Sequence, residues 1–300
     1  MTTNDAEGIL TAQRSDGHVQ WPNDQCTAAY YSYEDTERPD MSRGLITAFR
    51  TLTIFPVPGR DTSIHSDSLP FFPVVGAVLG LLLWALSLIN TLINGNGGWP
   101  MGVAAIMLLA SVISTRSLHL DGLADFVDAA GGGWDQSKRL EIMKDTRLGV
   151  FGAVAIILTL LCKWLAFARL IAAGSTIWLI LIHMLSRTMQ VHLAVKLPYA
   201  RSEGGTALPF VQDAAGYHRW VAFTIVLIAT LAYGPLGLVA LAVAQIITWV
   251  YGSWCRRNMG GITGDLLGAG NEIIEVTLLL LAAILGNQLP GCIGWGWLLS

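Results

Sequence analysis

Three aspartates in one short stretch have the type and spacing of metal ligands. If residues 119–129 form a helix, its 100° turn per residue places Asp121, Asp125 and Asp128 within about 60° of arc, on one face. At separations of about 6 Å and an effective dielectric near 20, each pair repels by roughly 3 kcal/mol, so a proton or a divalent ion should be bound there. Because oxygen-only ligands favour Mg²⁺ or Mn²⁺ over zinc or copper, the pattern predicts a site for one of these two ions. The alternative is a row of helix-capping, solvated acids.

Cationic residues follow these aspartates along the chain. Arg139, Lys144 and Arg147 could clamp phosphate oxygens, for which the guanidinium group is well shaped. They could instead form i,i+3 and i,i+4 ion pairs on a solvated helix. His119, just before the first aspartate, is a candidate ligand or base, with a capping or packing role as the alternative.

A second acidic patch, GGITGDLLGAGNEIIE, covers residues 260–275. Asp265 and Glu272 are seven residues apart and share a helical face, and Glu275 lies about one turn beyond Glu272. The patch could complete a site with the first stretch. Equally, it could be a glycine-rich loop with two acids capping the last helix.

Two basic residues, Lys163 and Arg187, interrupt otherwise apolar segments. A charge at the centre of a membrane span costs about 2.5–3.5 kcal/mol on insertion scales. Each side chain should therefore face the interior of a helix bundle and meet a partner or a ligand.

The composition of the chain indicates the class of protein to which these candidate site residues belong. The chain has 300 residues, of which 53% are hydrophobic and 13% charged, and its mean hydropathy is +0.54. These values are typical of an integral membrane protein, so we expect a lipid bilayer around it. A net charge of −3 without a basic run excludes nucleic acid as an expected partner.

The apolar segments predict an all-α, polytopic transmembrane bundle of about seven spans, because only helices satisfy an isolated segment's backbone in lipid. A polar first segment, 1–43, is expected to be a disordered tail, and 44–300 a membrane-embedded catalytic domain. Within that domain, 44–55 is too short to span and is expected either to lie in the interface or to pack on the bundle. The expected spans are 71–93, 99–118, 149–171, 175–195, 219–234, 236–253 and 273–289.

Charge placement predicts the orientation of the bundle. Every Asp and Glu beyond residue 70 falls in three of the connections between these spans, together with nearly all the remaining Lys and Arg. The positive-inside rule then places these connections and the N-terminus in the cytoplasm, in a multi-pass protein of the cell (inner) membrane.

Three blocks of sequence resemble one enzyme family. HLDGLADFVDA at 119–129, RLEIMKDTRLGVFG at 139–152 and GGITGDLLGAGNEIIE at 260–275 are similar to distinctive blocks of the cobalamin synthases, the adenosylcobinamide-GDP ribazoletransferases. Weaker similarities are FPVP at 55–58, FPVVG at 72–76, Ser186-Arg187 and YARSEGG at 199–205, so the resemblance runs in family order from about residue 44 to 285.

The resemblance implies a transferase of vitamin B12 (cobalamin) biosynthesis that completes nucleotide loop assembly with Mg²⁺. Adenosylcobinamide-GDP would donate its cobinamide phosphate to α-ribazole or α-ribazole 5′-phosphate, and GMP would leave. Asp121, Asp125 and Asp128 would hold the metal, with Asp265 completing the site or acting as base. The residues expected to bind substrate are His119, Arg139, Lys144, Arg147, Lys163, Arg187, Glu272 and Glu275.

Other readings of the same residues stay open. The Asp-Gly-x-x-x-Asp core is also similar to the signature of CDP-alcohol phosphotransferases of phospholipid synthesis. Basic residues inside spans would also suit a membrane transporter, although the chain shows no internal repeat. A homo-oligomer, or association with other corrinoid-pathway enzymes, is left open as well.

Overall fold

The computed structural model describes residues 14–15, 18–19, 41–94 and 98–296. The chain divides into two units, Met1–Asp40 and Met41–Ser300. In the first unit, β1 (Arg14–Ser15) and β2 (His18–Val19) pair antiparallel, with Arg14 opposite Val19. Residues 41–43, the end of the predicted disordered tail 1–43, are helical and begin α2 (Met41–Leu52). Apart from β1 and β2, the rest of that tail lies outside the described residues.

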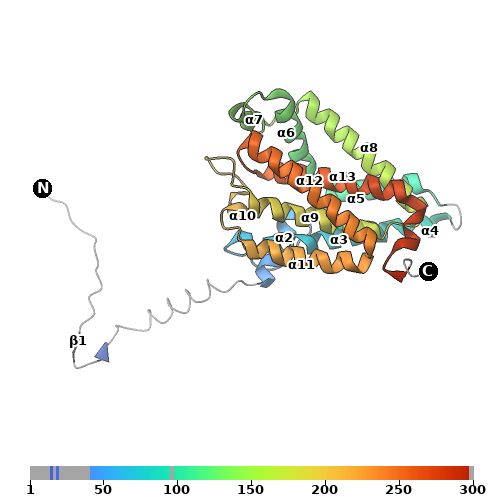
Figure 1. Ribbon diagram of the computed structural model, residues 1–300, viewed down its shortest axis with the longest axis horizontal. Helices are drawn as coiled ribbons and strands as arrows, with labels where there is room; N and C mark the ends of the chain where they lie inside the picture. Colours follow the sequence, from blue (N-terminus) through green and yellow to red (C-terminus); the bar gives the residue numbers. More distant parts are fainter. Residues whose placement is uncertain (1–13, 16–17, 20–40, 95–97, 297–300) are drawn as a thin grey trace. The chain divides into compact units, whose positions relative to one another are not determined.

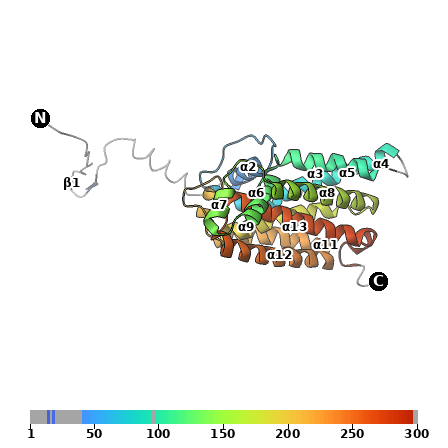
Figure 2. The same ribbon diagram turned by 90° about the horizontal axis from the view of Figure 1, so that it is seen from above.

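The described residues of the second unit form an all-helical bundle, which confirms the predicted fold class (Figures 1 and 2). Its longer helices run roughly along one axis, with α7 at one end of the body and α4 at the other in both views. The elements are α2 (Met41–Leu52), η1 (His65–Phe71), α3 (Phe72–Ser87), α4 (Ile89–Asn94), α5 (Pro100–Ser114), α6 (Leu118–Gly132), α7 (Gln136–Ile142), α8 (Val150–Ala172), α9 (Trp178–Lys196), α10 (Leu208–Gln212), α11 (Gly216–Tyr233), α12 (Pro235–Met259), α13 (Gly264–Leu285), η2 (Gly286–Gln288) and η3 (Pro290–Cys292).

The predicted count of seven spans is not confirmed. Among the described residues, four helical stretches are long and apolar enough to cross a membrane: His65–Leu92, Val150–Ala172, Pro235–Met259 and Gly264–Gln288. The pair Pro100–Ser114 and Leu118–Gly132 would count as a fifth, but it is bent by 84°. The predicted spans 175–195 and 219–234 correspond to α9 and α11, which do not meet the same criteria.

Helix α9 differs from a lipid-facing span because protein surrounds it. It packs against α3, α11, α12 and α13, and most of its residues are buried. The contact with α3 is especially close, because a Cβ at Gly76 would lie 2.3 Å from the carbonyl oxygen of His183. A helix covered by other helices can carry polar side chains that a lipid-facing helix could not, and this lowers its hydropathy.

The last long helix begins earlier than the sequence indicated. The expected span began at residue 273, whereas α13 begins at Gly264, where the Thr263 hydroxyl accepts a hydrogen bond from the backbone N–H of Leu266. Glu272 and Glu275 therefore lie inside a helix and are buried, with 4% and 1% of each residue exposed. The expectation that they lie in a connection with the other acids was wrong.

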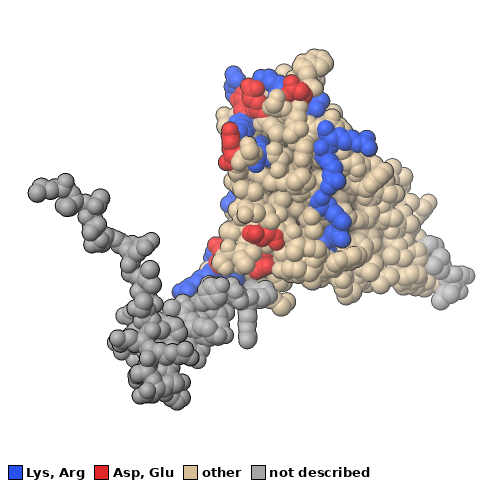
Figure 3. Space-filling model, turned by 60° about the vertical axis from the view of Figure 1, so that its left-hand side comes forward, with Lys and Arg blue, Asp and Glu red and all other residues tan. Residues whose placement is uncertain are grey.

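Charged side chains are unevenly spread over the surface in Figure 3. The acidic side chains in view lie on the left-hand part of the body, and the right-hand part shows none. Apart from the Lys and Arg side chains near the middle of this view, the right-hand part shows no charged side chains, as expected for apolar helices that could face lipid.

Candidate active site

A sharp bend between α5 and α6 positions the predicted aspartates. Arg116 and Ser117 adopt φ values of 52° and 57°, in the left-handed region that non-glycine residues rarely enter. The bend is tied to α2, because the guanidinium of Arg116 donates a hydrogen bond to the backbone carbonyl of Arg50 over 2.8 Å. Helix α6 then turns away from α5 by 84° and, as predicted, carries the three aspartates on helical backbone.

Helices α6 and α13 meet through glycines. A Cβ at Gly122 would lie 2.5 Å from the carbonyl oxygen of Asp265, and one at Gly268 would lie 3.2 Å from the Cα of His119. Glycine therefore permits a backbone approach that any side chain at Gly122 would prevent. The two acidic stretches, more than a hundred residues apart in the chain, are brought into contact by this packing.

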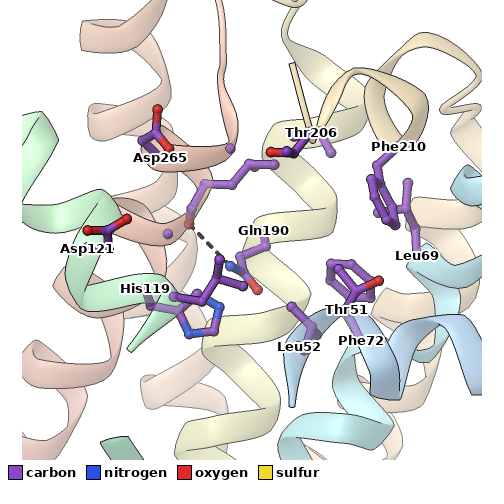
Figure 4. A pocket seen from close by; sticks show the side chains of 16 residues that line it. Thr51, Leu52, Leu69, Phe72, His119, Asp121, Gln190, Thr206, Phe210 and Asp265 are labelled. Atoms are coloured by element: carbon purple, nitrogen blue, oxygen red, sulfur yellow. Dashed lines mark hydrogen bonds between the residues drawn. The ribbon is translucent and has the colours of Figure 1, made fainter. Parts of the chain in front are cut away.

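The carboxylates of the two helices act on one another electrostatically. The charge of Asp125 interacts with the charges of Asp265, Asp121 and Asp128, and Asp265 also interacts with Asp121. Asp121 and Asp265 line one cavity, in which they lie on the same side in Figure 4. This is a concentration of negative charge that a cation or a proton would stabilise.

Arg201 was not singled out from the sequence as a site residue, although it lies in the weakly similar YARSEGG segment. Its Nη2 donates to Asp265 Oδ2 over 2.8 Å and to the carbonyl oxygen of Met143 over 3.3 Å. The segment reaches Asp265 because the backbone N–H groups of Ala200 and Ile262 donate to Ile262 and Pro198 in a short parallel pairing. Arg201 thus supplies positive charge beside the acids.

Asp128 has a different environment from the other two aspartates of α6. Its carboxylate oxygens accept hydrogen bonds from the backbone N–H groups of Gly149 and Gly152, over 2.8 and 2.9 Å. These N–H groups belong to the first turn of α8, where a carboxylate also compensates the helix dipole. Asp128 joins α6 to α8, so its oxygens are engaged in holding the fold.

The carboxylates of this site are chemically suitable ligands for Mg²⁺, but they do not complete its coordination by themselves. In the described part of the chain, no group of three or more Asp, Glu, His or Cys side chains is arranged to hold a metal ion. Magnesium sites that act on diphosphates commonly use one or two carboxylates, with substrate oxygens and water completing the coordination. Asp121, Asp125 and Asp265 can supply carboxylates of that kind.

The three predicted phosphate-binding cations are scattered along α7 and the loop that follows it. Arg139 reaches Asn258 and lies over the ring of Trp254, Lys144 pairs with Glu203, and Arg147 pairs with Asp145. Hydrogen bonds from Arg147 lower the pKa of Asp145 to about 2, and that from Lys144 lowers the pKa of Glu203. None of the three cations lines the cavity beside Asp121 and Asp265.

The two cations that the sequence placed inside predicted spans, Lys163 and Arg187, meet the two buried glutamates. Lys163 Nζ of α8 lies 2.7 Å from Glu272 Oε2 and 2.7 Å from Glu275 Oε1, both on α13. Arg187 of α9 donates to the other oxygen of Glu275. The expectation that both cations face the bundle interior and a partner is confirmed, and these four residues form a buried ion cluster that does not line the cavity.

The cavity itself has a volume of about 280 Å³ and lies where α2, η1, α6, α9, α10 and α13 converge. Figure 4 shows His119, Asp121, Gln190 and Asp265 on one side and Leu52, Leu69, Phe72 and Phe210 on the other. His119, predicted as a ligand or base, is buried against this space. Gln190 was not predicted, because a single glutamine within an apolar helix carries no recognisable signal.

Comparison with known proteins places the chain in a family. Residues 44–283 match the family model described as cobalamin-5-phosphate synthase. The chain is 42% identical over 250 residues to the "Adenosylcobinamide-GDP ribazoletransferase" of Chlorobaculum parvum, covering 81% of this chain and 96% of that protein. The proteins of the same name from Chlorobaculum tepidum and Syntrophobacter fumaroxidans are 43% and 41% identical, over 81% and 79% of this chain and 96% of each. No solved structure is significantly similar. The chain is therefore a member of the cobalamin-5-phosphate synthase family.

Proposed function

We propose that the protein joins adenosylcobinamide-GDP to α-ribazole, or to α-ribazole 5′-phosphate, and releases GMP. The relatives that carry this activity in their names align over nearly their whole length. The structural observation that carries the proposal is the meeting of α6 and α13. It brings Asp121, Asp125 and Asp265 together near Arg201, and two of these aspartates, Asp121 and Asp265, line a cavity.

The reaction requires an alcohol to attack one phosphorus of a diphosphate. A bond forms between the acceptor's ribose oxygen and the phosphorus that carries cobinamide, and the bond from that phosphorus to the bridging oxygen breaks. GMP leaves with the bridging oxygen, and the hydroxyl proton passes to a carboxylate. Asp121 and Asp265 are suited to receive it because both line the cavity, while Arg201 is placed to neutralise a nonbridging phosphate oxygen.

Mg²⁺ would be held by one or two of the carboxylates of Asp121, Asp125 and Asp265, together with oxygens of the diphosphate and water. When bound, it would supply positive charge to the phosphate oxygens during the transfer. Asp128, which the sequence placed in this set, serves in the proposal to hold α6 against the start of α8. The exposed cations Lys144 and Arg147 remain candidates for the GDP phosphates if they exchange Glu203 and Asp145 for substrate.

We further propose that this face of the bundle is cytoplasmic, in a cell membrane. The proposal follows from the gathering of Lys and Arg in the connections that flank the site and from the positive-inside rule.

The test is GMP release from adenosylcobinamide-GDP and α-ribazole by membranes that contain the protein. Wild-type membranes should release GMP only with Mg²⁺ present, and Asp121→Asn should lower the rate about 100-fold or more, since losing one metal-binding carboxylate removes several kcal/mol. Asp213→Asn is the matched control, because Asp213 is exposed and does not line the cavity. Wild-type membranes that release no GMP, or that release CMP from CDP-diacylglycerol instead, would overturn the proposed function.

A further inference from the structure

The cavity beside the carboxylates has one wall of apolar and aromatic side chains. Leu52, Leu69, Phe72 and Phe210 form this wall, and the rings of Phe72 and Phe210 lie 6.5 Å apart at 55° to one another (Figure 4). Leu52, Leu69 and Phe72 are all buried in the bundle. Such a wall favours a flat, largely apolar ring system over a charged or extended ligand.

The opposite wall contains polar atoms that the protein itself does not satisfy. His119 and Gln190 line the cavity with 2% and 4% of each residue exposed. Among the described residues, neither ring nitrogen of His119 has a hydrogen-bond partner, and Oε1 of Gln190 has none either. Gln190 is held in place through its amide nitrogen, which donates to the carbonyl of Leu267 over 3.3 Å. Because a buried polar group without a hydrogen-bond partner is unfavourable, these atoms indicate a ligand that brings its own donors and acceptors.

The size of the cavity indicates which of the two substrates of the proposed reaction it can bind. A cavity of about 280 Å³ lies near the lower end of small-molecule sites, which hold roughly 300–1,000 Å³. It suits a nucleoside. It cannot enclose the donor, whose corrin macrocycle carries a GDP arm.

We propose that this cavity is the binding site for the acceptor, a nucleoside with a flat heteroaromatic base. The base lies against Leu69, Phe72 and Phe210, and polar atoms of the nucleoside meet His119 and Gln190. The ribose then points towards Asp121 and Asp265, where its hydroxyl can be deprotonated and meet the donor's phosphorus. The inference rests on the proposed function, since it takes the acceptor to be α-ribazole or its 5′-phosphate.

The experiment is steady-state kinetics with each substrate varied in turn, on wild type and Gln190→Leu. Removing the amide should raise KM for α-ribazole about 5- to 10-fold, the equivalent of one hydrogen bond, while KM for adenosylcobinamide-GDP stays within twofold. Gln245→Leu is the matched control. Gln245, on α12, also has a buried Oε1 with no partner in the described residues, but it does not line the cavity.

A second variant, Ala207→Leu, tests the proposed binding site by filling the cavity. Ala207 lines the cavity and is 9% exposed, so the larger side chain should block it. Purified, folded Ala207→Leu in detergent should lose α-ribazole binding in calorimetry, and Ala214→Leu, whose alanine does not line the cavity, should keep it.

The two proposals fail differently. If wild type releases GMP but Gln190→Leu leaves KM for α-ribazole unchanged, or raises only KM for the donor, the acceptor site is overturned and the proposed function stands. Retained α-ribazole binding by folded Ala207→Leu would also overturn it. If wild type releases no GMP, the function itself is overturned.

Discussion

Replacing Lys163 with methionine tests the energetics of the buried ion cluster. Lys163 and Arg187 balance Glu272 and Glu275, so the substitution leaves one uncompensated negative charge inside the bundle. Methionine is close to lysine in length and apolar in character, so the packing of α8 against α13 should change little.

The size of the effect follows from the contacts. Each of the two 2.7 Å contacts of Lys163 is worth roughly 6 kcal/mol at an effective dielectric of 20, before desolvation is counted. Burying the ammonium and carboxylates offsets most of this attraction, and breaking a buried pair by removing one partner costs about 3–5 kcal/mol. We expect Lys163→Met to lower the free energy of unfolding by that amount.

The assay is unfolding of the purified protein by SDS in mixed micelles, followed by circular dichroism. Lys138→Met is the matched control, because Lys138 forms a 2.9 Å pair with Glu141 in which the side chains are 49% and 69% exposed. Such a pair contributes at most about 1 kcal/mol. Lys163→Met combined with Glu272→Gln restores charge balance and should recover at least half of the lost stability.

Two outcomes would refute this reasoning. If the free energy of unfolding of Lys163→Met lies within about 1 kcal/mol of the wild-type value, the cluster is hydrated or its charges are not held as described. A double variant no more stable than the single one would mean that the cost comes from packing and not from charge.

Two further substitutions test how the site is positioned. Gly122→Ala should reduce the rate of GMP release at least about tenfold, because its Cβ would meet the Asp265 carbonyl and separate α6 from α13. Gly132→Ala is the matched control, because the atom nearest to its Cβ would lie 3.4 Å away, and its rate should stay within twofold of wild type. Ser117→Gly should raise the free energy of unfolding by about 1 kcal/mol in the same SDS titration, because glycine adopts the φ of 57° without strain. A loss of stability in Ser117→Gly would show that the serine side chain outweighs the backbone strain.

Several features of this protein could be predicted from the sequence because they depend on local composition and periodicity. Apolar segments of about twenty residues indicated a helical membrane domain. The spacing of Asp121, Asp125 and Asp128 indicated one helical face, and α6 carries them as expected. The cost of a charge in lipid required partners for Lys163 and Arg187, although it did not identify them.

The tertiary structure decided which of these residues meet. Lys163 and Glu275 are 112 residues apart, and Arg201 and Asp265 are 64 apart, so each pairing depends on how helices pack and not on any local pattern. Packing also assigned Asp128 to the start of α8 and placed Gln190 against the cavity. Periodicity specifies the face of a helix on which a side chain lies, but only the neighbouring helix determines what that face touches.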